Sequence, residues 1–535
     1  NFTNANLAAS PVTFEVEGNL VAQATTGNVT DAAAATLTVG GNAGFLAPAG
    51  VLDLDSLDVS GSVAANTPHD ADLAAISGSN LNLGDATVGI GPTNPVTFTV
   101  GSNLTAASTA APITDTSSIL VSGTADFLGS NGNITLDDNP IVDGNVSLST
   151  PMGGNITVDT LTTSDPAIAT RTVSVNTVGG GNADVITDGQ GMGVNLGTAN
   201  TIVFNVSGDL TFEEQDGNLT DANQITVTGT GLFIASGTGV AGGAITLDDN
   251  PIVDGDVAFM TSDTGAMGAI LVNELQTSAN ITRTLSLNTT GATDATVVAD
   301  SMVGDIELGT ANGIAFNVGG NLGIEASQGE ITDLADSTIT VGGNAGLVAV
   351  GTDAGLTLNN GVTDAVNTGL NVTGSIALET SGNAIITSLQ RIDFGDINAF
   401  TTVLPGVGAT TGTAVTGSLE ATAEGNIVDD GLEVSVTVLD VDGTVFMDAN
   451  NGGSITGAVG GFDQFDPDEA DNVALQAEGL VNLTAIGPIT LGQVNATTLA
   501  TGTVDQRSIA ATTFNVSTTV GTGVLLRVRD TTAFS

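Results

Sequence analysis

The sequence contains no cysteine, lysine, tryptophan or tyrosine, and only one histidine among 535 residues. Without cysteine, neither a disulfide framework nor a cysteine–metal site is possible. Six arginines oppose 58 acidic residues, so the formal net charge is −52. Nucleic acid is therefore excluded as a partner, because neutralising phosphates requires clustered basic side chains. The absence of lysine also excludes Schiff-base chemistry and a P-loop nucleotide site.

Long hydrophobic runs are also missing. No stretch approaches the roughly 18 consecutive apolar residues of a membrane span, so we expect no membrane insertion. The start shows no signal-peptide pattern, and because it opens at Asn1 we expect a processed or excised segment. A hydrophobic content of 41% and a mean hydropathy of +0.30 argue against a disordered acidic tail. A lysine-free acidic chain rich in Thr, Asn and Gly favours an extracellular or cell-surface location.

Internal repeats dominate the chain. One nine-residue pattern, Val12-Thr-Phe-Glu-Val-Glu-Gly-Asn-Leu20, recurs with its Phe at positions 98, 204 and 316. Each copy is followed by Thr-Asp, with the aspartate at 31, 115, 221 and 333. The predicted super-repeats, 84–112 residues long, make up one continuous domain over residues 1–535. Their approximate ranges are 11–95, 96–201, 202–313, 314–410 and 411–513, with a truncated copy at 514–535.

A shorter period lies inside each super-repeat. Strand-like runs start about every 22 residues, alternate apolar and polar positions, and end at Gly, Asn, Asp or Ser. Amphipathic helical patterns are scarce. This combination predicts an all-β fold, an elongated parallel β-solenoid whose inward residues form a continuous apolar column. An array of β-sandwich domains is the alternative, since about 100 residues is also an immunoglobulin-like length.

Several phrases resemble a known class of repeat. Gly132-Asn-Ile-Thr-Leu136, Gly154-Asn-Ile-Thr-Val158 and Gly208-Asp-Leu-Thr-Phe212 are similar to coils of filamentous-haemagglutinin-like bacterial surface proteins. The resemblance covers most of residues 11–530 and is one of repeat style. It implies a right-handed parallel β-helix in an exported adhesin or fibre. The secretion domain of that family is not identifiable, so neither a secretion route nor a receptor is implied.

Catalytic residues are sparse. The single His69 lies in the polar turn Thr67-Pro-His-Asp70, and no nucleophile or metal-protease motif is present. Asp137/Asp138 and Asp248/Asp249 are paired carboxylates of the kind that glycoside hydrolysis needs. However, the chain lacks the Trp and Tyr platforms usual in sugar clefts. We therefore predict no enzymatic activity, with a polysaccharide-modifying β-helix enzyme as a remote alternative.

Calcium is the one cofactor that the sequence suggests. The phrase Leu-Asp-Asp-Asn-Pro-Ile-Val-Asp-Gly occurs twice and groups carboxylates that suit Ca²⁺, although such residues also serve turns. Its acidic residues are Asp137, Asp138 and Asp143 in one copy and Asp248, Asp249 and Asp254 in the other. A denser loop is predicted to be the better calcium site; it contains Asp463, Asp466, Asp468, Glu469 and Asp471. Asn-x-Ser/Thr sequons such as Asn28, Asn103, Asn133 and Asn218 are expected by chance in this composition.

The two ends suggest self-association. Open solenoid ends template further stacking, and neither terminus reads as a cap. Near the start, Phe14 and Val16 are predicted to face inward and Glu15 and Glu17 outward. Near the end, Leu526 and Val528 are predicted to face inward and Arg527 and Arg529 outward. Head-to-tail stacking would oppose arginine with glutamate and propagate as a fibre, although the arginines would equally neutralise acids within their own chain.

These observations predict a structural protein that forms the shaft of an extracellular filament. The expected partner is a further copy of the chain, with cell-surface or matrix glycans as a second class. The alternative is an adhesin stalk whose ligand-binding tip lies outside this segment.

Overall fold

The protein is a parallel β-solenoid without helices in the part of the chain that is described. The computed structural model describes residues 13–429 with gaps at 32–34, 89–94, 165–169, 189–192, 238–242, 263–267, 279–281, 300–304, 336, 353, 360–368, 389, 395–412, 418 and 425–426, and beyond residue 429 the strands β47 to β55. Successive turns are about 25 residues apart. The predicted fold class is confirmed, with turns slightly longer than the expected 22 residues. Within the described ranges, no helix is long and apolar enough to cross a membrane.

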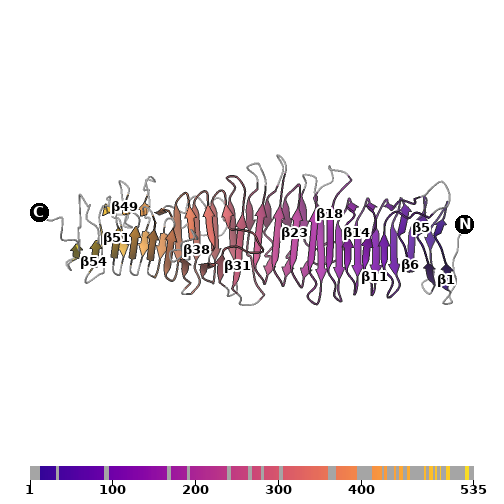
Figure 1. Ribbon diagram of the computed structural model, residues 1–535, viewed down its shortest axis with the longest axis horizontal. Coiled ribbons are helices and arrows are strands. Elements are labelled where there is room, and N and C mark those ends of the chain that lie inside the picture. The colour runs from indigo at the N-terminus through magenta and orange to yellow at the C-terminus, as the bar shows by residue number, and fades with distance from the viewer. Residues whose placement is uncertain are drawn as a thin grey trace. The chain divides into compact units, whose positions relative to one another are not determined.

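The chain divides into two compact units, residues 1–255 with 261–268 and residues 256–260 with 269–535. Figure 1 shows the strands coloured by residue number. Unit 1 has two sheets of stacked parallel strands. Sheet A contains β1 (Thr13–Val16), β3 (Val29–Thr30), β4 (Thr36–Val39), β6 (Leu52–Val59), β8 (Ala71–Ala75), β11 (Leu104–Ser108), β14 (Ala125–Gly129), β17 (Val146–Thr150), β19 (Arg171–Thr177), β21 (Val194–Leu196), β22 (Asn205–Val206), β24 (Leu219–Asp221), β25 (Thr226–Val227), β27 (Ile245–Leu247) and β28 (Ile252–Val253). Sheet B contains β2 (Leu20–Gln23), β5 (Ala43–Leu46), β7 (Val63–Thr67), β9 (Leu81–Leu83), β10 (Thr99–Val100), β12 (Ile113–Asp115), β13 (Leu120–Val121), β15 (Ile134–Leu136), β16 (Ile141–Val142), β18 (Ile156–Leu161), β20 (Ala183–Thr187), β23 (Leu210–Glu214) and β26 (Gly231–Ala235).

Unit 2 is built in the same way from two sheets and a final strand pair. Sheet C contains β30 (Ile270–Val272), β32 (Ala295–Ala299), β35 (Leu322–Ala326), β38 (Ala345–Ala349), β41 (Ile376–Thr380), β43 (Ile392–Phe394), β44 (Thr413–Val415), β46 (Ile427–Asp429), β47 (Leu439–Val441), β49 (Ile455–Gly457), β50 (Leu475–Ala477), β52 (Ile489–Thr490) and β53 (Val494–Asn495). Sheet D contains β29 (Val257–Thr261), β31 (Arg283–Asn288), β33 (Ile306–Leu308), β34 (Asn317–Val318), β36 (Ile331–Asp333), β37 (Thr338–Val341), β39 (Leu356–Leu358), β40 (Gly369–Val372), β42 (Ala384–Ser388), β45 (Leu419–Ala423), β48 (Val445–Ala449) and β51 (Val481–Ala485). The separate pair is β54 (Gly502–Gln506) and β55 (Val524–Val528).

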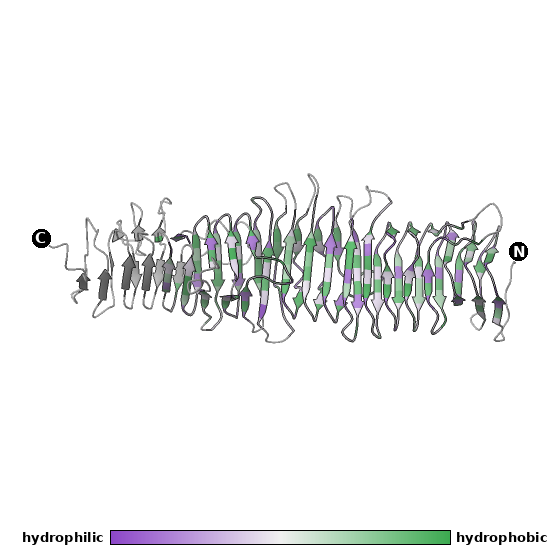
Figure 2. Ribbon diagram, viewed as in Figure 1, coloured by the Kyte–Doolittle hydropathy of each residue, from purple (hydrophilic) through white to green (hydrophobic). Residues whose placement is uncertain are grey.

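The core of each unit is a column of like residues stacked in register. Ile113 of β12 pairs with Ile134 of β15, and the outward Thr114 pairs with Thr135. Figure 2 shows the resulting alternation of hydrophobic and hydrophilic residues along the strands. Phe127 and other large inward side chains are fully buried, each contributing about 1.5–3 kcal/mol of transfer free energy. Period-two alternation therefore fixes which face of every strand is inside.

Consecutive super-repeats lie on opposite sheets of their unit. The repeated Phe14 is in sheet A, Phe98 directly precedes β10 in sheet B, and Phe204 precedes β22 in sheet A. The change from one sheet to the other happens where one long strand pairs with two short strands of the next coil. In sheet A, β19 pairs on one side with β17 and on the other with both β21 and β22. Unit 2 repeats this exchange, with β31 followed by β33 and β34.

The turns stack as closely as the strands, which explains two residue types. A Cβ on Gly144 would lie 2.7 Å from the carbonyl carbon and oxygen of Gly123 in the turn below it, so only glycine fits. Asn139 and Asn250 adopt positive φ values of 52° and 57°, a conformation that asparagine tolerates better than most residues. The phrase Leu-Asp-Asp-Asn-Pro-Ile-Val-Asp-Gly, which is identical at 136–144 and 247–255, is therefore largely required by the geometry of the turn.

Candidate functional site

A ladder of Asn and Asp side chains joins one coil to the next. Asn133 Oδ1 accepts the backbone N–H of Asn155 at 3.0 Å, and Asn155 Oδ1 accepts that of Asn182 at 3.0 Å. Asn182 then accepts the N–H of Asp209 at 2.9 Å, and Asp209 that of Thr230 at 2.8 Å. We call these residues, each directly preceding a strand, the turn ladder. Each bond satisfies a backbone donor that the turn would otherwise leave without a partner.

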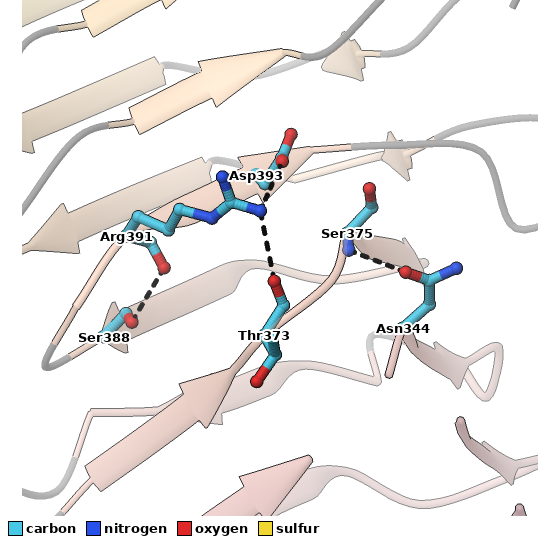
Figure 3. A network of polar contacts seen from close by, with 6 residues as sticks. All are labelled: Asn344, Thr373, Ser375, Ser388, Arg391 and Asp393. Atoms are coloured by element: carbon cyan, nitrogen blue, oxygen red, sulfur yellow. Dashed lines mark hydrogen bonds and ion pairs between the residues drawn. The ribbon is translucent and has the colours of Figure 1, made fainter. Parts of the chain in front are cut away.

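Unit 2 has the same turn ladder. Asp294 accepts the N–H of Asn321 at 2.7 Å, Asn321 that of Asn344 at 2.9 Å, and Asn344 that of Ser375 at 2.9 Å. The bond between Asn344 and Ser375 is drawn in Figure 3. The Gly-Asn-Ile-Thr phrases thus have a physical meaning. The Asn holds the next coil, the Ile enters the core and the Thr faces outward.

The aspartate of each Thr-Asp motif makes a second type of contact. Asp115 accepts the N–H of Asp137 at 2.7 Å through Oδ1 and that of Asp138 at 3.2 Å through Oδ2. Asp221 repeats this with Asp248 at 2.8 Å and Asp249 at 3.1 Å. These carboxylates hold the start of the turn in the following coil.

Two equivalent carboxylate triads result from this contact. They consist of Asp115, Asp137 and Asp138 on the sheet B side, and of Asp221, Asp248 and Asp249 on the sheet A side. Within each triad, one carboxylate oxygen per residue lies within 4.8 Å of the others. Burial raises the pKa of Asp115 to about 6, and the adjacent charges of Asp138 and Asp137 add to this against the lowering effect of the two N–H bonds. Burial likewise raises the pKa of Asp221 to about 6.

The triads include only part of the predicted calcium ligands. Asp137, Asp138, Asp248 and Asp249 lie in them, whereas the sequence analysis did not select Asp115 and Asp221 as ligands. Asp143 instead accepts the N–H of Ser164 at 2.7 Å and its hydroxyl at 2.8 Å, and neither Asp143 nor Asp254 belongs to a triad. The densest predicted loop, Asp463 to Asp471, is outside the described residues. The exposed pair in each triad offers the hard oxygen ligands that calcium prefers.

A third acidic cluster lies on the outer face of sheet A. Asp53 of β6 pairs in register with Asp72 of β8, and Asp55 is close to both. Burial raises the pKa of Asp72, and the negative charges of Asp55, Asp53 and Asp126 raise it further. The alternation Leu52-Asp-Leu-Asp55 places Asp53 and Asp55 on one face, but their proximity to Asp72 depends on the stacking of coils and was not predicted.

Two buried arginines lie where consecutive super-repeats change from one sheet of their unit to the other. Arg171, at the start of β19, is 3% exposed and donates to the backbone carbonyls of Thr162 at 2.8 Å, Val142 at 3.0 Å and Leu161. Burial lowers its pKa to about 10, opposed by the negative charges of Glu214, Asp188 and Asp143. Arg283, at the start of β31, donates to Gln276 O at 2.9 Å and Leu275 O at 3.0 Å.

A third arginine, Arg391, lies just before β43 (Figure 3). Its Nη2 donates to the carbonyl of Thr373 at 3.1 Å and forms an ion pair with Asp393 at 3.1 Å. Its side chain is 49% exposed, whereas that of Asp393 is 3% exposed. Arg171 and Arg283 occupy equivalent positions in their super-repeats, each at the start of the long strand and followed by Thr.

The residues predicted for the subunit interface are only partly described. In β1, Phe14 and Val16 are half-buried, while Glu15 and the following Glu17 are exposed. Leu526, Arg527 and Val528 lie in β55, whose backbone pairs in parallel with β54 and sets Arg527 beside Asp505. The side chains of β55, and Arg529, are outside the described part. His69 lies in an exposed turn, where its N–H bonds to the Thr67 hydroxyl at 3.1 Å.

Comparisons of the chain with protein-family models, with curated proteins and with solved structures gave no match. The fold itself is that of a β-helix repeat protein.

Proposed function

We propose that this protein is a non-enzymatic structural subunit forming the shaft of an extracellular or cell-surface filament by head-to-tail stacking. The observation that carries this proposal is the turn ladder. In both units, polar side chains that often carry chemistry in other proteins bind the backbone of the next coil instead. Each such bond contributes about 0.5–1.5 kcal/mol net, and the bonds recur along the stack, as expected of an element that carries load.

The carboxylates support the same proposal over a glycan-cleaving enzyme. In glycosidases the two carboxyl groups lie about 5–5.5 Å apart when one attacks the sugar itself, and about 6.5–9.5 Å apart when a water must fit beside the sugar, whereas oxygens of the triads lie within 4.8 Å of one another. Asp115 and Asp221 also have their oxygens engaged by backbone N–H groups. The carboxylates thus contribute to holding the turns.

The alternative function is an adhesin stalk whose binding tip lies elsewhere. It rests on the resemblance of the Gly-Asn-Ile-Thr coils to filamentous-haemagglutinin-like proteins, and cell-surface or matrix glycans would then be the partners of the tip. A stalk and a filament subunit share every contact described above. They differ in whether the isolated chain polymerises.

Negative-stain electron microscopy of the purified chain tests the proposal, with light scattering over a range of protein concentrations. We expect unbranched filaments one solenoid wide, lengthening as the concentration rises. Monomers at every concentration would favour the stalk instead. The same grids with and without a calcium chelator show whether calcium, bound at the triads or in the acidic loop at 463–471, contributes to filament assembly. Shortening by the chelator and recovery with added calcium would assign the ion a role in assembly.

A further inference from the structure

Three antiparallel bridges occur among the described residues of this parallel fold. They join Ala86 to Val96, Ala199 to Ile202 and Ala311 to Ile314. In each bridge the two residues exchange both backbone N–H···O bonds, at 2.8–3.2 Å. Every bridge follows a short strand and ends two residues before the Phe that begins the next super-repeat. We call the bridged segments strap 1 (residues 85–88 with 95–97), strap 2 (198–203) and strap 3 (310–315).

Strap 1 crosses the outer face of sheet B over three successive coils. Its Thr87 carbonyl accepts the side-chain amide of Asn42 at 2.9 Å and that of Asn19 at 3.2 Å. These two residues directly precede β5 and β2. The strap also shares one buried apolar cluster with the sheet, made of Leu46, Ala64, Ala86, Val88 and Val96. Since Leu46 belongs to β5 and Ala64 to β7, the strap contacts the coils of β2, β5 and β7, which stack in that order.

Strap 2 reaches equally far along sheet A. The Asn200 side-chain amide donates to Ala125 O at 3.0 Å and to Ser147 Oγ at 3.4 Å. Ser174 Oγ donates to Ile202 O at 2.7 Å. These partners lie in β14, β17 and β19, which are again three successive strands of the stack.

Strap 3 repeats this arrangement in unit 2. The Asn312 side-chain amide donates to Asp256 O at 3.3 Å, directly before β29. Ser286 Oγ of β31 donates to Ile314 O at 2.7 Å. The strap therefore joins the coils of β29 and β31, which pair with each other.

The sheet beneath each strap has small outward residues aligned in register. The pairs are Gly44 with Ala64, Ser147 with Ser174, and Ala258 with Ser286. A Cβ on Gly44 would lie 2.8 Å from a methyl group of Val96. The other five members are fully buried although they lie on the outer face. The sequence thus leaves room for a strap at these positions.

Strap 2 also contains a strained backbone. Its central residues, Asn200 and Thr201, have φ values of 48° and 74°, and a positive φ is unfavourable for a β-branched residue such as threonine. In strap 3 the same positions are Asn312 and Gly313, with φ values of 50° and 77°. Strain of this kind persists only where surrounding contacts hold it, so the contacts of strap 2 outweigh its cost.

In a solenoid, each coil normally contacts only its neighbours, and stability is a sum of neighbour terms. We propose that the straps couple coils that are not neighbours, so that the coils beneath one strap open as one cooperative block instead of one by one. Strap 2 joins β14, β17 and β19 into such a block, and strap 1 does the same for β2, β5 and β7. The device acts within one chain, whether or not chains stack into a filament. In a shaft under load, it stops the peeling of coils at each strap.

Hydrogen exchange of the full chain, followed by mass spectrometry at increasing urea concentrations, tests this coupling. In the parent, β14, β17 and β19 should share one opening free energy and one urea slope. Asn200→Gly removes the side-chain bonds of the strap and tolerates the positive φ. We expect about 2- to 13-fold faster exchange in β14 and β17, the range for one lost hydrogen bond, and a different urea slope for each of the three strands.

The matched control, Asn155→Gly, removes a bond between adjacent coils, the one that Asn155 Oδ1 accepts from the Asn182 N–H at 3.0 Å. It should speed exchange in β14, β17 and β19 together and leave their urea slope shared. Different slopes in the parent, or a slope that stays shared in Asn200→Gly, would overturn the coupling.

Thr201→Gly tests the strap in the opposite direction. It installs the residue that strap 3 has at Gly313 and relieves a strain that exceeds the entropic cost of glycine. Exchange should therefore slow in β14, β17 and β19 alike. Slower exchange confined to β19, which pairs with the strands on both sides of the strap, would contradict a reach across three coils.

Discussion

At the scale of single residues, the position in the coil decides what an aspartate does. Burial raises the pKa of Asp115 to about 6. By contrast, the Ser102 hydroxyl and the Asn103 N–H lower the pKa of Asp70, which is on the open surface. The two residues are chemically identical, but one is enclosed beside two other carboxylates and the other receives donors from the next coil. The aspartates that make up the large negative charge therefore differ in pKa from one site to another.

The triads predict how stability changes with pH. The pKa of Asp115 and that of Asp221 are about 6 in the folded chain against the ordinary 3.8, so the folded state binds these protons more tightly. The resulting stabilisation is fully present below pH 3.8 and is lost as the pH rises through about 6. Asp115→Asn with Asp221→Asn should flatten the rise in thermal midpoint on lowering the pH from 7 to 4. Circular-dichroism melts measure this.

The control for that experiment removes two charges from the turn ladder instead. Asp209→Asn and Asp294→Asn keep a ladder acceptor, as Asn182 and Asn321 do at equivalent positions. This variant measures how far the loss of two negative charges alone changes the pH dependence. If the triad variant changes it no more than this control does, the two buried carboxyls do not hold the extra protons.

Much of the residue pattern could be read from the sequence, but its cause could not. The Asn-x-Thr sequons were expected by chance, yet Asn28, Asn133 and Asn218 each accept an N–H of the following coil. The sequon is therefore produced by the architecture, because a ladder Asn, an inward apolar residue and an outward Thr follow in that order. The separation of turn-ladder partners varies from 20 to 33 residues, and a single sequence does not indicate which residues meet.

At the scale of strands, the buried arginines donate hydrogen bonds to backbone carbonyls at the point where the super-repeats change from one sheet to the other. Near the end of β18, its register with β20 shifts between Val158 and Leu161, and the carbonyls of Leu161 and Thr162 at this break each accept one backbone N–H at 2.9 Å. The Arg171 guanidinium supplies donors there. The super-repeats follow from the recurring Phe-x-Val pattern of the sequence. Their alternation between sheets was not predicted, because inward and outward patterns look alike on either sheet.

Removing this arginine should weaken the exchange. Arg171→Met removes the guanidinium hydrogen bonds to the carbonyls of Val142 and Thr162, while Thr162 O keeps the Val142 N–H; a hydrogen bond to a charged group contributes about 1.5–3 kcal/mol. Hydrogen exchange followed by mass spectrometry should show faster exchange in β18 and β19 than in β11 and β14. Arg171→Lys retains the charge but not the forked donor geometry, so its exchange rates in β18 and β19 should lie between those of the parent and those of Arg171→Met. An unfolding midpoint and exchange pattern equal to those of the parent would show that these carbonyls need no such donor.

At the scale of the whole molecule, a net charge of −52 accompanies stacking that brings carboxylates into register. Asp53 lies directly beside Asp72, whose pKa the nearby Asp126 also raises. Asp393 is paired with Arg391 at 3.1 Å, but the chain has only six arginines for 58 acidic residues. Two exposed charges about 4 Å apart repel by about 1 kcal/mol in water, so the coat of carboxylates opposes the fold that presents it.

Sodium chloride should therefore stabilise the solenoid. Between about 0.01 M and about 1 M salt the Debye length falls from about 30 Å to about 3 Å, which screens repulsion between exposed carboxylates. We expect the thermal midpoint to rise over this range, with most of the rise at the lower concentrations. Asp53→Asn with Asp72→Asn should reduce the slope, because it removes one directly stacked pair. A midpoint that fell with salt would mean that attractive ion pairs outweigh this repulsion.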